Sequence, residues 1–395
     1  MDTFTLPQGF CRARKALPSA LVPDNFDILV IGAGQAGLSA AYHLCRLGLV
    51  PEKDFLVLDH AEGPGGAWQH RWPSLTLTTV NGMHDLPGMR FDETLPPGSE
   101  HAQVSTAVPH YYELYEKRFD LRVHRPVSVR VVCDRTGDGQ RCEGRGEVLH
   151  AETDTAGTLR ARGLINCTGT WERPFVPRYR GQEDFAGRQL HTRDYHDAAE
   201  FAGKHVIVVG GGISALQLLD EISQVTSTTW VTRREPQFRD TAFGPEDGRA
   251  AVARVEDRVR RGLPPGSVVS VTGLPWTDAL RAAKARGALD RRPIFDHIEP
   301  SGVRWADGDF QAADVILWAT GFRSSLDHLA PLRLRGPGGG ITMTGQLATR
   351  VAADPRIHLI GYGPSASTIG ANRAGRAAAT ELTAELGLSG LRDRR

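Results

Sequence analysis

The chain has 395 residues, which is long enough for two domains that each bury a hydrophobic core. Its 47 basic and 46 acidic residues leave a net charge of +1, and this balance argues against nucleic acid or an anionic membrane as the main partner. No run of about 18 apolar residues appears, and the N-terminal sequence has no apolar stretch suited to export. We therefore expect a cytoplasmic protein with no membrane span.

The first predicted unit is a strand, a glycine turn and a helix within FDILVIGAGQAGLSAAYHLCRLG, followed by a second strand in PEKDFLVLD. Glycines in a G-x-G-x-x-G turn let the backbone approach a pyrophosphate at the positive end of the helix. An acid at the end of the second strand can accept hydrogen bonds from ribose hydroxyls. A glycine turn without a ligand is the alternative. The predicted contacts are Gly32, Ala33, Gly34, Gln35, Ala36, Gly37 and Asp59.

The same pattern recurs in KHVIVVGGGISALQLLDEI and TTWVTRRE. Here Ala215 takes the place of the third glycine, and Arg233 and Arg234 stand where the first unit has Asp59. Guanidinium groups can bind a 2′-phosphate, so this unit favours NADPH, whereas the acid of the first unit favours FAD. A solvated arginine pair is the alternative. The predicted contacts are Gly210, Gly212, Ser214, Ala215, Arg233 and Arg234.

The rest of the chain completes two α/β units. ADVILWATGF and DPRIHLIGYG are typical of strands that end in glycine turns, with cofactor contacts expected at Thr320, Gly321 and Gly361, and residues 365–386 predict a closing helix. The Arg-, Ala-, Gly- and Pro-rich residues 233–299 predict helices and loops that cover a sheet. We predict an α/β fold of two Rossmann-like dinucleotide-binding domains. The FAD domain comprises 1–172 and 326–395, with an NADPH domain, 173–325, inserted.

Five motifs in order make the chain resemble the class B flavoprotein monooxygenases. Besides the two glycine turns, they are Gly65-Gly66-Ala67-Trp68, Phe185-x-Gly187-x-x-x-His191-x-x-x-Tyr195 and Ala319-Thr320-Gly321-Phe322. The resemblance implies that NADPH reduces FAD, that O2 then gives a flavin C4a-(hydro)peroxide, and that one oxygen atom passes to a small organic substrate. The Baeyer–Villiger branch usually has Trp-Pro where this chain has Tyr195-His196, which favours N-, S- or C-oxygenation.

The resemblance also assigns roles near the flavin. Gly66 would allow close backbone approach, and Trp68 would shield one face of the cofactor. Asn81 would lie near the flavin C4a and N5 edge and hold a peroxide or the NADP+ amide, although Asn81-Gly82 is also a turn signal. For His191 we favour a structural bond to a backbone carbonyl over proton transfer.

Two other functions remain possible from the sequence. One is an NADPH-dependent flavoprotein reductase, against which the five cysteines count because they include no C-x-x-C pair. The other is a non-catalytic NADPH-binding redox sensor. The scattered histidines predict no metal site, and neither the substrate nor the oligomeric state follows from the sequence.

Overall fold

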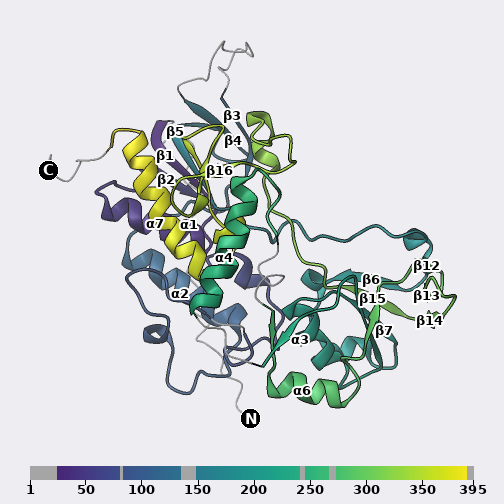
Figure 1. The fold of residues 1–395 in the computed structure, drawn as a ribbon. Coiled ribbons are helices and arrows are strands. Elements are labelled where there is room, and N and C mark those ends of the chain that lie inside the picture. The colour runs from purple at the N-terminus through teal and green to yellow at the C-terminus, as the bar shows by residue number, and fades with distance from the viewer. Residues whose placement is uncertain (1–24, 81–82, 135–147, 241–244, 267–272, 389–395) are drawn as a thin grey trace.

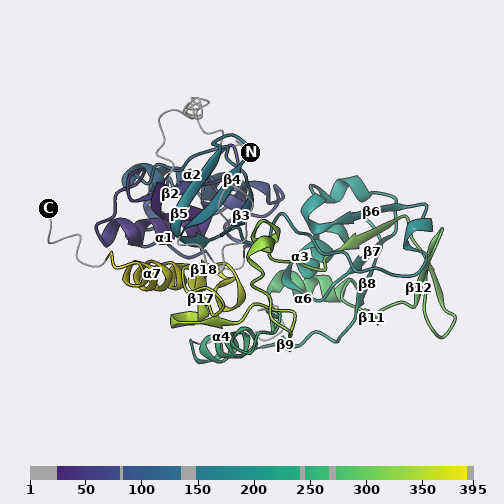
Figure 2. The same cartoon turned by 90° about the horizontal axis from the view of Figure 1, so that it is seen from above.

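The computed structural model describes residues 25–80, 83–134, 148–240, 245–266 and 273–388. Two α/β bodies lie side by side, each built on its own sheet (Figure 1). The view from above shows the same separation, with the strand β12, His297–Glu299, at the far end of the second body (Figure 2). Within these ranges no helix has the length and apolar character needed to cross a membrane.

The first body is built on a sheet with the strand order β16-β17-β18-β5-β1-β2 and a hairpin, β3 and β4, that pairs with β5. The helices α1 and α7 pack against each other so closely that a Cβ on Gly375 would come within 2.5 Å of Ser39 Oγ. The elements are β1 Asn25–Ile31, α1 Gln35–Arg46, β2 Phe55–Leu58, α2 Val104–Arg118, β3 Val129–Cys133, β4 Leu149–Thr153, β5 Thr158–Asn166, β16 Met343–Thr344, β17 Arg350–Val351, β18 Ile357–Leu359 and α7 Thr368–Glu385.

The second body contains a parallel sheet with the order β11-β8-β7-β15-β6. Its central strands, VIVV and VILW, are wholly buried, as expected for a parallel sheet covered on both faces. The elements are β6 Arg188–His191, β7 Val206–Val209, α3 Ile213–Ile222, β8 Thr228–Thr232, β9 Phe238–Arg239, β10 Leu274–Pro275, α6 Asp278–Ala285, β11 Arg291–Pro293, β13 Gly302–Arg304, β14 Phe310–Ala312 and β15 Val315–Trp318.

Helix α4, Pro245–Arg260, packs on the first body although its neighbours in sequence belong to the second (Figure 1). Val259 is buried in the core around β16 and β18, and Arg260 Nη2 donates to Gly345 O at 2.9 Å. This helix lies within the segment 173–325 that we predicted as the NADPH domain, whose boundaries stay a prediction.

Short 3-10 helices join the main elements. They are η1 Gly66–His70, η2 Asp92–Thr94, η3 Gln182–Asp184, η4 Thr192–Asp194, η5 Ala198–Phe201, η6 Asp327–Leu332, η7 Gln346–Ala348 and η8 Gly363–Ser365.

The structure confirms the predicted fold class and both strand-turn-helix units, at Asn25–Leu58 and Val206–Thr232. The prediction of helices and loops alone for residues 233–299 was wrong, because the strand β11 extends the second sheet. The helix α4 packs on the core of the first body. The sequence RRP of β11 has no apolar run, because this short strand lies at a sheet edge, where Arg291 and Arg292 are only partly buried and Pro293 is exposed.

His358 is buried on β18 with an incomplete set of hydrogen bonds. Its Nδ1 lies 3.2 Å from Thr349 Oγ1, and its Nε2 has no partner among the described residues. Burial, with a smaller effect from Arg350, lowers the pKa of His358 to about 3. The imidazole is therefore neutral in the folded protein near neutral pH.

Acidification should destabilise the protein partly through His358. An unfolded chain protonates this side chain near its ordinary pKa of 6.5, whereas the folded protein resists protonation down to about pH 3, so stability falls as the pH drops through this window. One such group contributes a slope of about 1.4 kcal/mol per pH unit. Urea unfolding at several pH values should give a steeper dependence for the wild type than for His358→Leu. Parallel dependences would contradict the assignment.

Candidate functional site

The first glycine turn lies at the carboxyl end of β1, pressed against the neighbouring strand. Gly32 has φ of +96°, and a Cβ there would come within 2.6 Å of Cys167 O. A Cβ on Gly37 would meet Gly32 O at 1.8 Å, whereas one on Gly34 would meet nothing within 4 Å. The first two contacts fix the turn, and Gly34 borders open space.

The start of α1 is left free to bind an anion. Gly34 is its N-cap residue, without a side-chain cap, and the first turn carries no acidic residue. The first N–H groups of a helix have no intrahelical acceptor, and they carry the positive end of the helix dipole. An uncapped N-terminus beside open space is what a dinucleotide pyrophosphate requires, so these residues suit the FAD that the sequence predicts.

Asp59 braces the glycine turn from the end of β2. Its Oδ2 accepts a hydrogen bond from Ala33 N at 2.6 Å, its Oδ1 accepts one from Ala61 N at 2.8 Å, and the side chain is buried. The carboxylate therefore holds the backbone that approaches the pyrophosphate. Its predicted contact with ribose stays a prediction.

Gln35 joins the first glycine turn to the surrounding elements. Its Nε2 donates to His84 O and to Asn372 Oδ1, at 3.1 and 3.3 Å, and its Oε1 accepts from Tyr112 OH at 3.2 Å. Ala36 is buried beside it. Gln35 thus ties the start of α1 to α2, to α7 and to the segment that contains His84.

The helix η1 brings the predicted flavin-shielding tryptophan to the same turn. A Cβ on Gly66 would lie 3.0 Å from Gly34 Cα, so η1 packs directly on the first glycine turn. Trp68 is half-buried and packs against the core of this body. By contrast, Trp72 is fully buried, its ring meets Tyr195 edge to face, and it belongs to the interface between the bodies.

The second glycine turn repeats the arrangement of the first. Gly210 has φ of +150°, and a Cβ there would come within 2.2 Å of Ala319 O. Gly212 is the uncapped N-cap residue of α3 and borders open space, and Ala215 is fully buried where the helix meets the sheet. Ser214 follows within the first turn of α3. The second turn thus has the same construction as the first, and its binding of NADPH stays a prediction.

The predicted phosphate-binding arginines lie at the carboxyl end of β8. Arg233 and Arg234 are exposed, and neither forms an ion pair with a described residue. Sequence reasoning missed a third cation, Arg291 on β11, whose Nη1 donates to Thr232 Oγ1 at 3.1 Å. The register that pairs β11 with β8 could not be read from the sequence. Together these side chains form a basic rim next to the second turn.

The fingerprint that ends in Tyr195 is largely structural, as we predicted for His191. His191 Nδ1 accepts from Arg193 N at 3.1 Å, and its Nε2 donates to Gly321 O at 2.9 Å. Burial lowers the pKa of His191, which favours this neutral tautomer. A Cβ on Gly187 would lie 2.4 Å from Asp314 O, and Phe185 is buried.

Thr320 and Gly321 lie where the chain returns from the second body to the first. Thr320 Oγ1 donates to Phe175 O, and Gly321 O accepts from Phe175 N at 2.9 Å, so the outgoing and returning segments run together. Gly361, after β18, has φ of +72° and approaches Gly169. All three thus lie either just after the carboxyl end of a sheet strand or on the crossing, by which we mean the two chain segments that connect the bodies. Asn81, the predicted catalytic residue, lies outside the described residues.

Glu221 of α3 joins the fingerprint to the first body, and sequence reasoning did not find it. Its carboxylate accepts from Tyr195 OH at 2.8 Å, from Trp72 Nε1 at 3.1 Å and from Ser74 Oγ at 2.7 Å. Hydrogen bonds to a charged acceptor are worth roughly 1.5 to 3 kcal/mol each. The fingerprint tyrosine therefore helps to fix how the two bodies meet.

Comparison with known proteins agrees with this geometry. The profile of the family described as pyridine nucleotide-disulphide oxidoreductase matches residues 29–246. The structure of a flavin-containing monooxygenase from Stenotrophomonas maltophilia is similar, with a TM-score of 0.74, 35% identity, and coverage of 92% of this chain and 99% of that chain.

Curated relatives point the same way. The FAD-containing monooxygenase EthA of Mycobacterium tuberculosis is 25% identical over 277 residues, which cover 68% of this chain and 52% of the relative. An indole-3-pyruvate monooxygenase of Oryza sativa is 27% identical over 331 residues, 75% of this chain and 77% of the relative. The chain thus spans about half the length of the first of these relatives.

Loss of either predicted phosphate-binding arginine should change coenzyme choice. Because a hydrogen bond to a charged group is worth roughly 1.5 to 3 kcal/mol, Arg233→Ala and Arg234→Ala should each weaken NADPH binding by about one to two orders of magnitude and leave NADH nearly unchanged. Calorimetric titration with both coenzymes measures this. Arg180→Ala serves as the control, because it removes an exposed arginine of the second body that pairs with Asp296. Equal losses for the two coenzymes would mean that these arginines do not bind the 2′-phosphate.

Proposed function

The chain belongs to the pyridine nucleotide-disulphide oxidoreductase family and, within it, to the class B flavoprotein monooxygenases, and from this we propose that it transfers one oxygen atom from O2 to a small organic substrate. Enzymes of this class are oxidoreductases that use FAD and NADPH. The observation that carries the proposal is the pair of uncapped helix starts, at Gly34 and Gly212, each beside its own glycine turn.

The two glycine turns would bind different cofactors. Gly32, Gly34 and Gly37 would hold the FAD pyrophosphate, and Gly210 and Gly212 that of NADPH. Bound FAD would supply the redox chemistry, taking a hydride from NADPH and passing electrons to O2. The protein's part would be to place the two cofactors and to exclude water from the flavin.

Aromatic side chains gather where the two bodies meet, and we propose that they exclude water. Trp171 stacks on Phe322 with ring centroids 5.1 Å apart, and Phe322 meets the ring of His191 edge to face at 4.8 Å. Trp68 belongs to η1, the 3-10 helix that packs on the first glycine turn. Such a wall would keep solvent from a reactive flavin without acid–base catalysis by a side chain.

We further propose oxygenation of nitrogen, sulfur or carbon in preference to Baeyer–Villiger insertion. The sequence Tyr195-His196 replaces the Trp-Pro that is usual in the Baeyer–Villiger branch. In this chain the Tyr195 hydroxyl donates a hydrogen bond to Glu221 at 2.8 Å.

A disulfide reductase is the other activity that the family description raises. Such an enzyme needs two reactive thiols beside the flavin. The cysteines in the described ranges, Cys45, Cys133 and Cys167, are unpaired. Cys167 is buried beside Gly32, and burial raises the pKa of its thiol, so it is a poor nucleophile. The described cysteines therefore favour oxygenation over disulfide reduction.

Product analysis under ¹⁸O2 tests the proposal. The FAD-loaded protein is given NADPH and, in turn, amines, thioethers, indoles and ketones, and mass spectrometry should find one ¹⁸O atom in the product of at least one amine, thioether or indole. Gly210→Val, which blocks the second turn through the 2.2 Å contact, should abolish NADPH oxidation while FAD stays bound. NADPH oxidation that yields only hydrogen peroxide with every substrate would contradict oxygen transfer.

Asn81 is our proposed group for protecting the flavin–oxygen adduct, on the resemblance alone. With a substrate that the screen has identified, Asn81→Ala should raise the share of NADPH oxidation that ends as hydrogen peroxide, while the anaerobic rate of flavin reduction changes little. Asn81→Asp keeps the side-chain size as a control. Slower reduction with an unchanged peroxide share would place Asn81 on the coenzyme instead.

A further inference from the structure

The side chain of Arg71 has no ion-pair partner among the described residues. Its guanidinium carbon lies 5.4 Å from the centroid of the Trp68 ring and 5.0 Å from that of Trp171. The side chain is half-buried, its Nε is wholly shielded from solvent, and none of its nitrogens has a hydrogen-bond or ion-pair partner among the described residues. A guanidinium presents five N–H donors in one plane, and those of Arg71 have no acceptor among the described residues.

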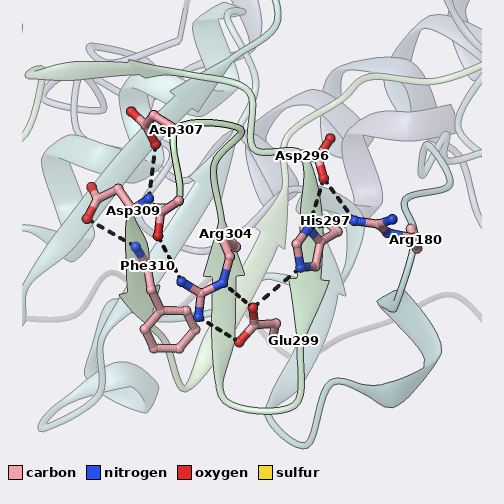
Figure 3. Close-up of polar contacts among 9 residues, drawn as sticks. Arg180, Asp296, His297, Glu299, Arg304, Asp307, Asp309 and Phe310 are labelled. Carbon is pink, nitrogen blue, oxygen red and sulfur yellow. Dashed lines mark hydrogen bonds and ion pairs between the residues drawn. The ribbon is translucent and has the colours of Figure 1, made fainter.

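Other arginines in this protein have the partner that Arg71 lacks. The half-buried Arg125 makes a bidentate pair with Glu116, both distances being 2.7 Å. On the second body, Arg304 lies over the Phe310 ring at 4.9 Å and also pairs with Glu299, within a network in which His297 and Asp296 are engaged as well (Figure 3). Contact with an aromatic ring therefore does not replace the carboxylate at Arg304.

Among the described residues, the carboxylate near Arg71 is already engaged by other side chains. The nearby carboxylate is Glu172, which pairs with Arg193 at 3.1 Å and lies 3.5 Å from His60 Nε2. Arg193 itself lies 6.0 Å from the Trp171 ring, so it adds positive charge. Burial lowers the pKa of Arg71 to about 10, still far above neutral pH, so the group stays charged. A buried charge left unpaired is costly.

The position of Arg71 links the two parts that surround the cofactor site. It directly follows η1, which packs on Gly34 of the first glycine turn. On its other side Trp171 stacks on Phe322, next to the fingerprint His191 on the crossing. The dinucleotide cofactors proposed for this protein are anionic, and their diphosphates carry the charge.

We propose that Arg71 binds the diphosphate of a dinucleotide cofactor, with the two tryptophan rings holding its guanidinium in place. The inference rests on the proposed use of FAD and NADPH. The guanidinium carbon lies over both rings, which offer no hydrogen-bond acceptor, so the N–H donors stay available for phosphate oxygens. Lysine has no such planar set of donors. Arg71 is thus a binding residue contributed by the segment after Gly65-Gly66-Ala67-Trp68.

Binding measurements on Arg71→Met, Arg71→Lys and wild type test the proposal without reference to turnover. FAD affinity is measured by quenching of flavin fluorescence on the apoprotein, and NADP+ affinity by calorimetry on FAD-loaded protein. Arg71→Met should weaken binding of at least one of these ligands by about 10- to 100-fold, with partial recovery in Arg71→Lys. Arg304→Met, which removes an arginine that has its own carboxylate partner, should change neither affinity.

The ligand that loses affinity identifies the diphosphate: FAD alone, NADP+ alone, or both. The ligand-free protein provides a second readout, because removing an unpaired charge should leave the thermal midpoint of Arg71→Met equal to or above that of wild type. A lower midpoint with both affinities unchanged would overturn the proposal and make Arg71 a packing residue. Failure of the wild type to bind FAD or NADP+ would instead refute the proposed function.

Discussion

Both glycine turns depend on one steric constraint, the contact between a glycine and the carbonyl that directly follows a neighbouring strand. Gly32 meets Cys167 O after β5, and Gly210 meets Ala319 O after β15, at distances that no Cβ could tolerate. Each contact makes the chain turn at the carboxyl end of its strand. The helices α1 and α3 begin directly after these turns, and neither has a side-chain cap. The free N–H groups of these helices then face the space that a pyrophosphate would fill.

The two turns become one catalytic unit through the crossing between the bodies. Gly321 O accepts from both Phe175 N and His191 Nε2, which holds the outgoing and returning segments together. Glu221 then anchors Tyr195 to Trp72 and Ser74 of the first body. Because the fingerprint supplies both His191 and Tyr195, its spacing sets the relation between the bodies, and its residues need not touch a substrate.

The sequence was a good guide wherever the signal was local. Strand, glycine turn and helix are adjacent in the chain, so the units around Gly32 and Gly210 and the fold class could be predicted. Features set by distant pairing could not. The edge strand β11, which brings Arg291 to the second turn, is defined by its register with β8 and not by an apolar run.

The same reason explains the site residues that sequence reasoning missed. Glu221 is separated from Trp72 by 149 positions, and nothing in its helical sequence distinguishes it from a solvated acid. Arg71 stands out only once Trp171 is placed beside it and its Nε is found without a hydrogen-bond partner among the described residues. The role of each group depends on which residues lie beside it in the fold, and sequence periodicity carries no information about these neighbours.

The central claim is that the two turns bind different dinucleotides and that hydride passes between them. Anaerobic mixing of the FAD-loaded protein with one equivalent of NADPH, followed by flavin absorbance, tests it most directly. The account predicts full loss of the oxidised flavin band in the wild type. It also predicts retention of the band in Gly210→Val, which still holds FAD. A wild-type flavin that stays oxidised, or a Gly210→Val protein that is reduced at the wild-type rate, would contradict it.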